Sequence, residues 1–500
     1  NLSWSQGKLN NVISGRLKLN KYIQKSFQYT TLNTFDVEVS TSLHLPSSFI
    51  LIAPSTLKTG GAEIGVEGNI SLKPGDQSID LRLAAKNGSI HLLANLLPNN
   101  VAASINEYQS TGEIQIDAKL KGRMSKGSSP ALMINYTLEN VSLTHPEFGA
   151  DISGLNFDGA VKISKLSDLT TTKLSVTKAT GALMGKPFDF TAEVINLIEP
   201  KMNLDFEGAI DAGWLSRQIG YDQAKSANGE IFVKLDYTGI IDGKVDAASE
   251  KMDGSIQLRD INIDLPSGTA LTHLDGGIDF SPRAIYVTNL SGNWGKSDFL
   301  LNGDITGIKG FATIASSQTT LNIGAELKSE HSFLDQIVAD IIEVTKKNQE
   351  EQVKNIPDVN FSLKFLISAL NFRRFSGSEI NGALSYDKPT LVVERFSSRT
   401  MGGEVALNGL LRTEQNGDIF IQAHSATNRV EVDSLFYVFN NFNQKFLTNE
   451  YLRGQLTSEA FASMYFTKEW SLRRNLLRAE TKLKVSNGEL NNFEPIMALG

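Results

Sequence analysis

A repeated unit of strand, helix and strand constrains the fold of this chain more than any other feature of its sequence. The clearest copy runs from Leu321 to Leu366, where alternating apolar residues lead to Ser332 and an amphipathic helical pattern. A polar run follows this pattern, and the next strand starts after Pro357. The same order recurs at Ile79–Leu120, Met202–Tyr237 and Ile419–Met464. The period of roughly 100–120 residues predicts a repeat protein made mostly of strands.

The helical pieces of the copies differ in strength. The sequence places them at Ile90–Leu97, Asp211–Ile219, Ser332–Val344 and Asp433–Phe446. We expect them to cap the sheet, each burying one apolar stripe, because surface helices normally do so. Aromatic residues gather in the last of these pieces and at Phe361–Phe375. Core packing is their ordinary role, and a membrane-facing or lipid-gating role at one end of the sheet is a second hypothesis.

A glycine signature marks equivalent strands in the copies. It reads apolar, polar, Gly, any residue, apolar, polar, apolar at Phe157–Ile163, Leu274–Phe280 and Ile380–Tyr386. An Asp-Gly or Asn-Gly pair is typical of a tight hairpin. The apolar alternation resumes at once on both sides, however, so a glycine bulge or strong strand bend fits at least as well. Further strands follow each signature at matching distances, which predicts approximate repeats over 1–148, 149–264, 265–371 and 372–500 of one continuous body.

The alternating strands leave one apolar face that needs a partner. By a rough count there are about 25–30 strands, each with one dry and one wet face, and few helices to cover them. The apolar faces can close into sandwiches or barrels, coil as a solenoid, or line a trough filled by a guest such as lipid chains. Sandwiches and solenoids are favoured on general grounds, whereas the long period favours one sheet that grows by segments.

Composition limits the possible chemistry. The chain has 500 residues, a net charge of −7 and no cysteine. The acidic balance argues against a nucleic-acid-binding protein, which needs a basic surface. The lack of cysteine excludes disulfides, zinc–thiolate sites and thiol catalysis. No stretch approaches the about 18 apolar residues of a membrane-spanning helix. Since the chain begins without Met, we expect it to be part of a longer protein.

The sequence contains no motif of a catalytic or metal site. No nucleophile elbow, phosphate-binding glycine loop or EF-hand loop occurs. The histidines lie far apart and lack metal-ligand spacing: His44, His91, His145, His273, His331 and His424. We therefore predict a protein that is not an enzyme and has no cofactor. The paired carboxylates of a glycosidase would meet only in the fold, so a carbohydrate-active β protein stays an alternative.

The C-terminal stretch carries a more specific signal. An alternating strand from Glu480 runs into Asn487–Leu490, read as an Asn-Gly-Glu-Leu turn, and then into Asn492–Pro495, Asn-Phe-Glu-Pro. This order resembles the C-terminal region of AsmA-family proteins, especially the Bacteroidota branch. That family is related to TamB and to chorein-type bridge-like lipid transfer proteins. The specific match covers a small part of the chain, and the diffuse pattern of repeated strands covers most of it.

The resemblance implies both a fold and a function. The implied fold is mainly β, an elongated, repeating, taco-shaped β-groove of antiparallel strands with short amphipathic helices between repeats. The implied protein lies in the periplasm, held in the inner membrane by an N-terminal anchor absent from this chain. It would transfer phospholipid between inner and outer membranes and so serve outer-membrane biogenesis. Its partners would be phospholipids and outer-membrane or periplasmic proteins, without nucleic acid.

The groove would be lined by inward-facing strand positions rather than by a point site. We expect the lining to include Ile114, Ile116, Leu120, Ile231, Val233, Leu235, Phe361 and Leu363. The alternative function is a structural or adhesive β-sandwich array of the cell envelope, with closed cores and no lipid cargo.

Overall fold

The computed structural model describes the chain except for residues 1, 6, 19–21, 25–26, 30–33, 60–61, 89–108, 126, 146–149, 219–225, 241–250, 309–319, 351–357 and 492–500. Among the described residues, 25 strands belong to one sheet, and β3 and β4 pair with each other. The prediction of a mainly β fold built on one many-stranded sheet with few helices is therefore confirmed. The chain divides into two compact units: Asn1–Asp211 with Phe232–Gly254, and Ala212–Ile231 with Ser255–Gly500.

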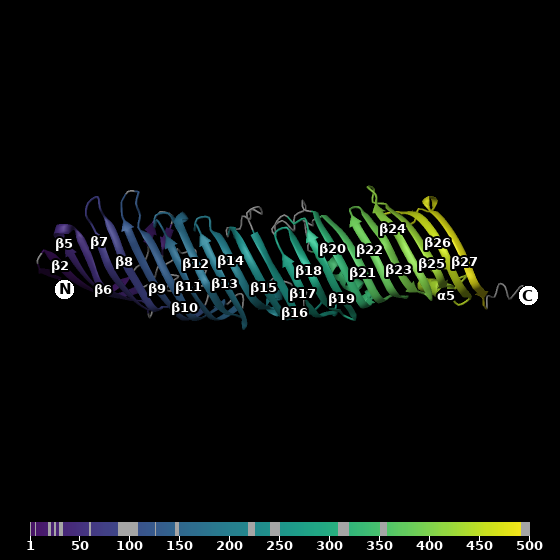
Figure 1. Cartoon of the computed structure of the whole chain (residues 1–500), viewed down its shortest axis with the longest axis horizontal. Coiled ribbons are helices and arrows are strands. Elements are labelled where there is room, and N and C mark those ends of the chain that lie inside the picture. The colour runs from purple at the N-terminus through teal and green to yellow at the C-terminus, as the bar shows by residue number, and fades with distance from the viewer. Residues whose placement is uncertain are drawn as a thin grey trace, which may run out of the picture. The chain divides into compact units, whose positions relative to one another are not determined.

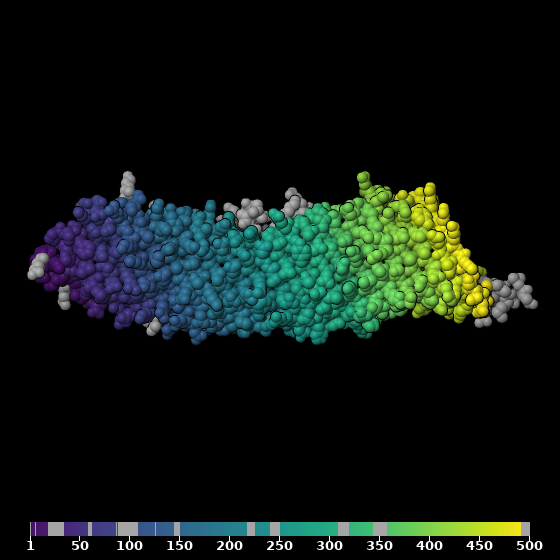
Figure 2. Space-filling view, in the orientation of Figure 1, coloured from purple at the N-terminus to yellow at the C-terminus, as the bar shows by residue number. Residues whose placement is uncertain are grey.

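Unit 1 is an antiparallel meander, in which successive strands of the large sheet pair and the colour changes steadily from strand to strand (Figure 1). Figure 2 shows the same gradual change of colour over the surface of this unit. Two short 3-10 turns, η1 (Leu45–Ser47) and η2 (Leu169–Thr171), join strands. The strands are β1 (Leu2–Ser5), β2 (Lys8–Lys18), β3 (Tyr22–Gln24), β4 (Phe27–Tyr29), β5 (Thr34–His44), β6 (Phe49–Thr59), β7 (Ala62–Ser71), β8 (Ser78–Gly88), β9 (Gln109–Arg123), β10 (Ala131–His145), β11 (Ala150–Ile163), β12 (Thr172–Leu183), β13 (Lys186–Ile195) and β14 (Lys201–Asp211).

Strands β15 (Ser226–Ile240) and β16 (Lys251–Asp264) contribute residues to both units. Unit 2 is again a meander of neighbouring strands (Figure 1). Its described residues include the α-helices α3 (Ala212–Gln218), α4 (Leu334–Glu350) and α5 (Val432–Val438). Its other elements are β17 (Ala270–Phe280), β18 (Ala284–Trp294), β19 (Ser297–Thr306), β20 (Thr320–Phe333), β21 (Asp358–Phe372), β22 (Phe375–Asp387), β23 (Thr390–Thr400), β24 (Gly403–Thr413), β25 (Ile419–Glu431), η4 (Asn440–Asn443), β26 (Leu452–Phe466), η5 (Arg474–Leu476) and β27 (Arg478–Leu490).

One pair of strands departs from the predicted antiparallel sheet. Strands β20 and β21 run parallel, with Thr320 opposite Asp358 and Phe333 opposite Asn371. Parallel neighbours need a crossover, because the chain must return to the end of the sheet where the first strand began. Helix α4, with 17 residues, lies in this connection. The expectation of antiparallel pairing throughout is therefore wrong at this one described pair.

The helices follow the sequence pattern with shifted ends. Helix α3 covers the predicted piece at Asp211–Ile219, whereas α4 starts two residues later than Ser332 and extends beyond Val344. Helix α5 ends at Val438, and the short turn η4 follows it, so the last predicted helix is broken. The piece predicted at Ile90–Leu97 lies outside the described residues.

The glycine signatures lie inside strands β11, β17 and β22 and form no hairpins. The pairing of β17 with β18 shifts register between Asp275 and Gly277, and Gly276 has a φ of 154°. Strand β22 likewise shifts register against β23 beside its signature. The glycine-bulge interpretation is therefore confirmed at Gly276, whereas Gly159 and Gly382 are paired in regular register with their neighbouring strands. Two of these glycines also make room for a ring on the neighbouring strand, since Gly159 lies opposite Tyr136 and Gly382 lies opposite Phe365.

The two faces of the sheet differ in chemistry. On the wet face, charged side chains pair across neighbouring strands, as in Arg82–Asp117 at 2.6 Å and Lys121–Asp80 at 2.8 Å in unit 1. Such exposed pairs add little stability, but they show that this face is solvated. The opposite face carries the apolar residues predicted by the alternation.

Candidate functional site

An apolar row crosses the sheet of unit 2, with one side chain from each strand between β17 and β26. The register places these residues side by side on the apolar face: Phe280, Ile285, Ile305, Ile323, Phe361, Tyr386, Leu391, Leu411, Ile421 and Met464. Every one of these side chains is partly exposed rather than buried. Phe361 and Tyr386 stack with ring centres 5.7 Å apart.

A second row runs beside the first and is built largely from small residues. It comprises Ile278, Val287, Gly303, Ala325, Leu363, Leu384, Val393, Gly409, Ala423 and Ala462, all of them partly exposed. A Cβ at Gly303 would lie 2.5 Å from the carbonyl oxygen of Gly324, and one at Gly409 would lie 2.3 Å from that of Gln422. Close strand approach therefore requires glycine at both positions. We call the two rows together the apolar face of unit 2.

Part of the corresponding face of unit 1, between β8 and β13, covers itself. Ile114 is 1% exposed and Ile116 is 6% exposed, and both belong to a closed cluster formed by β8 to β12. Tyr136 lies in the same cluster, where burial raises its pKa to about 12. Larger, partly buried side chains complete the packing, among them Phe157 of β11 and Phe188 and Phe190 of β13. Unit 1 between β8 and β13 is therefore a filled core, unlike the apolar face of unit 2.

The residues predicted to line a groove fall into three groups. Phe361 and Leu363 lie next to each other in the two rows of the apolar face of unit 2. Ile114 and Ile116 lie in the core of unit 1, and Leu120 is a partly exposed neighbour of Leu132.

The third group lies on β15. Ile231 packs against the cluster of Ala212, Ile261 and Leu274, while Val233 and Leu235 are partly exposed. Whether any of these residues lines a lipid groove stays a prediction. Sequence reasoning did not single out Tyr386, Leu411, Ile421 and Met464, although the same alternation marks them.

The ends of the strands in unit 2 form two different rims. Helices α4 and α5 both follow strands that end at the same rim, where the label α5 lies in Figure 1. We call this rim the helix rim. It includes Thr269–Ala270, Trp294–Ser297, Phe372–Phe375 and Thr400–Gly403. The opposite rim has turns at Phe280–Ala284 and Asp387–Thr390.

Helix α4 is held on the helix rim partly by polar contacts. The buried Asp340 carboxylate accepts hydrogen bonds from Trp294 Nε1 at 2.7 Å and from Thr269 Oγ1 at 3.1 Å. Leu334 packs at the other end against a cluster that contains Ile367. Consequently the apolar stripe expected to be buried is partly exposed, with Val338, Ile341 and Ile342 exposed by 38%, 51% and 49%. The expectation that this helix buries its whole apolar stripe is wrong.

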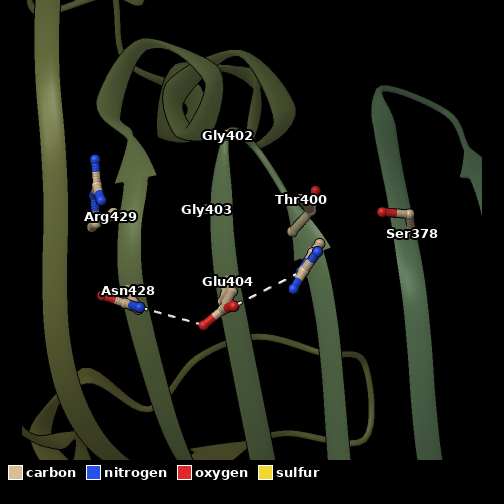
Figure 3. Close-up of a pocket in the computed structure, with 8 residues that line it drawn as sticks. Ser378, Thr400, Gly402, Gly403, Glu404, Asn428 and Arg429 are labelled. Atoms are coloured by element: carbon tan, nitrogen blue, oxygen red, sulfur yellow. Dashed lines mark hydrogen bonds and ion pairs between the residues drawn. The ribbon is translucent and has the colours of Figure 1, made fainter.

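A hollow of about 600 Å³ on unit 2 is polar (Figure 3). Its lining comprises Ser378, Arg399, Thr400, Gly402, Gly403, Glu404, Asn428 and Arg429. Glu404 accepts a hydrogen bond of 3.3 Å from Asn428 and pairs with Arg399 at 3.8 Å, and Arg399 also pairs with Glu379 at 2.8 Å. Arg429 donates a hydrogen bond of 3.2 Å to Gln455. The lining is therefore dominated by charged and polar groups and provides no apolar wall for an acyl chain.

The described residues contain no group of three or more histidine and acidic side chains arranged as metal ligands. His273 lies 2.8 Å from Asp260, and His424 lies 3.2 Å from Glu459, as exposed pairs. In the part of the chain that the structure describes, no helix has both the length and the apolar character needed to cross a bilayer.

The stretch that carries the family resemblance is partly described. Strand β27 continues through Asn487–Leu490, and Asn487 adopts a φ of 51° where the register against β26 shifts. The expected Asn-Gly-Glu-Leu turn is therefore a bulged strand, and Asn492–Pro495 lies outside the described residues. No protein-family model, curated protein or solved structure matches the chain. Membership of the AsmA family stays a prediction.

Proposed function

We propose that this protein carries phospholipid acyl chains along the apolar face of unit 2. The observation that supports the proposal is the pair of apolar rows, whose side chains are all partly exposed although they cross the sheet from β17 to β26 without a charged residue. Neighbouring strands lie about 4.8 Å apart, so each row extends over roughly 40 Å. The hydrocarbon core of a bilayer is about 30 Å thick. Each row is therefore longer than two acyl chains, one from each leaflet, placed end to end.

The energetics favour a hydrocarbon guest on this face. Each CH₂ group moved out of water contributes about 0.8 kcal/mol of binding free energy. The apolar side chains that the acyl chain covers contribute a similar free energy per unit of buried area. The second row provides space, because its glycine and alanine residues leave the sheet surface low between larger neighbours. Since no charged side chain interrupts the rows, a chain could slide from strand to strand while its headgroup stays in water.

The family resemblance supplies the setting of the proposal. On that basis the protein acts in the periplasm, anchored in the inner membrane, in phospholipid transfer toward the outer membrane and in outer-membrane biogenesis. Phospholipids are its cargo, and envelope proteins are its candidate partners. Carrying phospholipid requires no catalytic residue, which agrees with the prediction of a protein that is not an enzyme.

Unit 1 favours a second candidate function. Its core between β8 and β13 is filled by its own side chains, with Ile114, Leu138 and Val141 almost wholly buried. A chain built only of such cores would be a structural or adhesive array of the cell envelope without lipid. The state of the apolar face of unit 2 in solution distinguishes the two functions.

The test compares two neighbouring residues of β25 that point to opposite faces. Ile421 lies in the first apolar row, and Gln422 is exposed on the wet face. We expect Ile421→Asp to lower uptake of a fluorescent phospholipid by about tenfold or more, because a carboxylate on the path of the chain costs at least 1.4 kcal/mol. Gln422→Asp should leave uptake unchanged.

Native mass spectrometry of the purified protein provides the second measurement. We expect phospholipid to accompany the wild-type chain and the Gln422→Asp variant, and to be depleted from Ile421→Asp. Circular dichroism must show that both variants are folded. Lipid-free wild-type protein that takes up no fluorescent phospholipid would rule the proposal out and leave the adhesive array as the better function.

A further inference from the structure

Four aromatic side chains of the segment 437–446 are exposed on the helix rim of unit 2. Tyr437 is 50% exposed, Phe439 and Phe442 are each 55% exposed, and Phe446 is 70% exposed. They belong to the end of α5 and to the segment that follows it. Single exposed apolar residues are common on protein surfaces, whereas a contiguous group of large ones marks a site of interaction. We call residues 437–446 the aromatic loop.

The aromatic loop holds an unfavourable backbone conformation. Asn440, Asn441, Phe442 and Asn443 have φ values of 50°, 52°, 52° and 57° in succession. Asparagine tolerates this left-handed region, but phenylalanine does not, at a cost of about 1–2 kcal/mol. Strain of this kind persists where the surrounding structure enforces it, and it is concentrated at functional positions.

Side-chain contacts fix the aromatic loop in place. Phe442 stacks on Phe439 with ring centres 5.6 Å apart, and it meets Phe436 edge-on at 5.1 Å. The Gln444 side-chain oxygen accepts hydrogen bonds of 2.8 Å from the backbone of both Phe446 and Leu447. The exposed rings are therefore presented by a braced segment rather than by a loosely packed one.

Cationic side chains flank the exposed rings. The Arg374 guanidinium lies 5.1 Å from the ring centre of Tyr437 and donates a 3.3 Å hydrogen bond to its carbonyl oxygen. Arg373, which precedes Arg374 in the sequence, is exposed, and so is Lys445 in the aromatic loop. The nearest acidic group of α5, Asp433, is paired with Arg453 at 3.6 Å. The aromatic loop thus combines exposed rings with positive charge.

Helix α4 adjoins this surface. The backbone N–H of Arg373 donates a 2.8 Å hydrogen bond to Asp335 in the first turn of α4. The exposed Val338, Ile341 and Ile342 of α4 therefore lie on the same rim as the aromatic loop. Both helices of this rim expose apolar side chains, although they differ in length and in the strands that they connect.

We propose that the aromatic loop is a membrane-docking surface that inserts its rings into the interface of a phospholipid bilayer with anionic headgroups. Aromatic rings settle at the headgroup level of bilayers, and neighbouring cations attract anionic lipids. The rings project from the end of a helix, and a bilayer accepts such rings at any spacing, whereas a protein partner would need a matching hollow. This inference does not depend on the carriage of lipid on the apolar face.

The test is flotation of the full chain with vesicles of phosphatidylcholine, with and without phosphatidylglycerol. The first variant is Phe439→Ser, Phe442→Ser and Phe446→Ser together. Its matched control replaces three large residues elsewhere that are 49–52% exposed, Leu45→Ser, Tyr286→Ser and Leu366→Ser. The second variant is Arg373→Gln with Arg374→Gln. Near-ultraviolet circular dichroism verifies that each protein is folded.

We expect the phenylalanine variant to lose binding by about ten- to a hundredfold, because interfacial binding scales with the apolar area that is buried. The control should bind as the wild type does. The arginine variant should lose the preference for phosphatidylglycerol and retain weak binding to both vesicles.

Equal loss in the phenylalanine variant and its control would overturn the proposal, as would a wild type that binds neither vesicle. The latter result would assign the aromatic loop to a protein partner instead. The Ile421→Asp variant separates docking from lipid carriage, since it should float like the wild type while failing to take up phospholipid.

Discussion

Replacing Gly382 by alanine tests why the glycine signature exists. Gly382 lies opposite Phe365 across β21 and β22, and a Cβ at this position would meet the Phe365 ring at 2.0 Å. The φ of Gly382 is outside the left-handed region, so alanine is acceptable to its backbone. The ring is therefore the obstacle. It would have to leave its place beside Ile367 and Ile380, which form the adjoining buried cluster.

The expected loss of stability follows from overpacking. Forcing a ring out of a packed site costs about 1–3 kcal/mol, so Gly382→Ala should lower the free energy of unfolding by about 2 kcal/mol. Gly277→Ala is the control, because the nearest obstacle to its Cβ is the flexible end of Gln257, 3.4 Å away. We expect this control to change stability by less than about 0.5 kcal/mol.

The assay is urea unfolding followed by circular dichroism and by intrinsic fluorescence, since two units can unfold separately. Phe365→Leu in the Gly382→Ala background should recover part of the loss, with a coupling energy of about 1–2 kcal/mol between the two sites. Equal stability of Gly382→Ala and Gly277→Ala, or the absence of coupling to Phe365, would refute the reasoning that the ring requires the glycine.

Two further predictions concern pH. Burial raises the pKa of Tyr136 to about 12, so the unfolded chain loses this proton near pH 10 while the folded chain keeps it. Stability should therefore fall between about pH 10 and 12, and Tyr136→Phe should make this fall shallower by up to about 2 kcal/mol in alkaline urea titrations. An unchanged alkaline profile would contradict the assignment. Burial would raise the pKa of Asp298, but hydrogen bonds from the backbone N–H groups of Glu330 and His331 keep this pKa below its usual value. The stability that these bonds provide should be present above about pH 4 and lost as the pH falls further. Asp298→Asn should remove this dependence on acid pH. Thermal unfolding measured across the acid range provides the test.

The strand framework could be predicted from the sequence because alternation is a local signal. In each strand of the copies, apolar residues recur at every second position. The Ile380–Tyr386 signature lies within β22, as predicted from the alternation on both sides of it. The bulge beside it could also be anticipated, since a turn would have ended the alternation. These features depend on neighbouring residues alone.

The parts that could not be predicted depend on contacts between distant residues. The helical period of α4 indicates an apolar stripe. The side of the helix that faces the rim, however, is set by the hydrogen bonds of Asp340 with Trp294 and Thr269, which lie far away in the sequence. Similarly, Ile114 and Phe361 have the same local pattern. Only the packing around them makes one a core residue of unit 1 and the other part of a partly exposed row.

The parallel pair β20 and β21 explains how α4 and α5 come to lie on one rim despite an irregular number of strands. In an antiparallel meander every added or omitted strand reverses the direction of the next one. Only β21 separates α4 from the signature strand β22, whereas β15 and β16 separate α3 from the signature strand β17. With antiparallel pairing, this omission would turn β22 around and carry α5 to the opposite rim. The crossover through α4 restores the direction, because β21 again ends where β20 ends. A long connection between β20 and β21 is therefore a requirement of the topology. Helix α4 begins this connection, so its exposed Val338, Ile341 and Ile342 lie on the same rim as the aromatic loop.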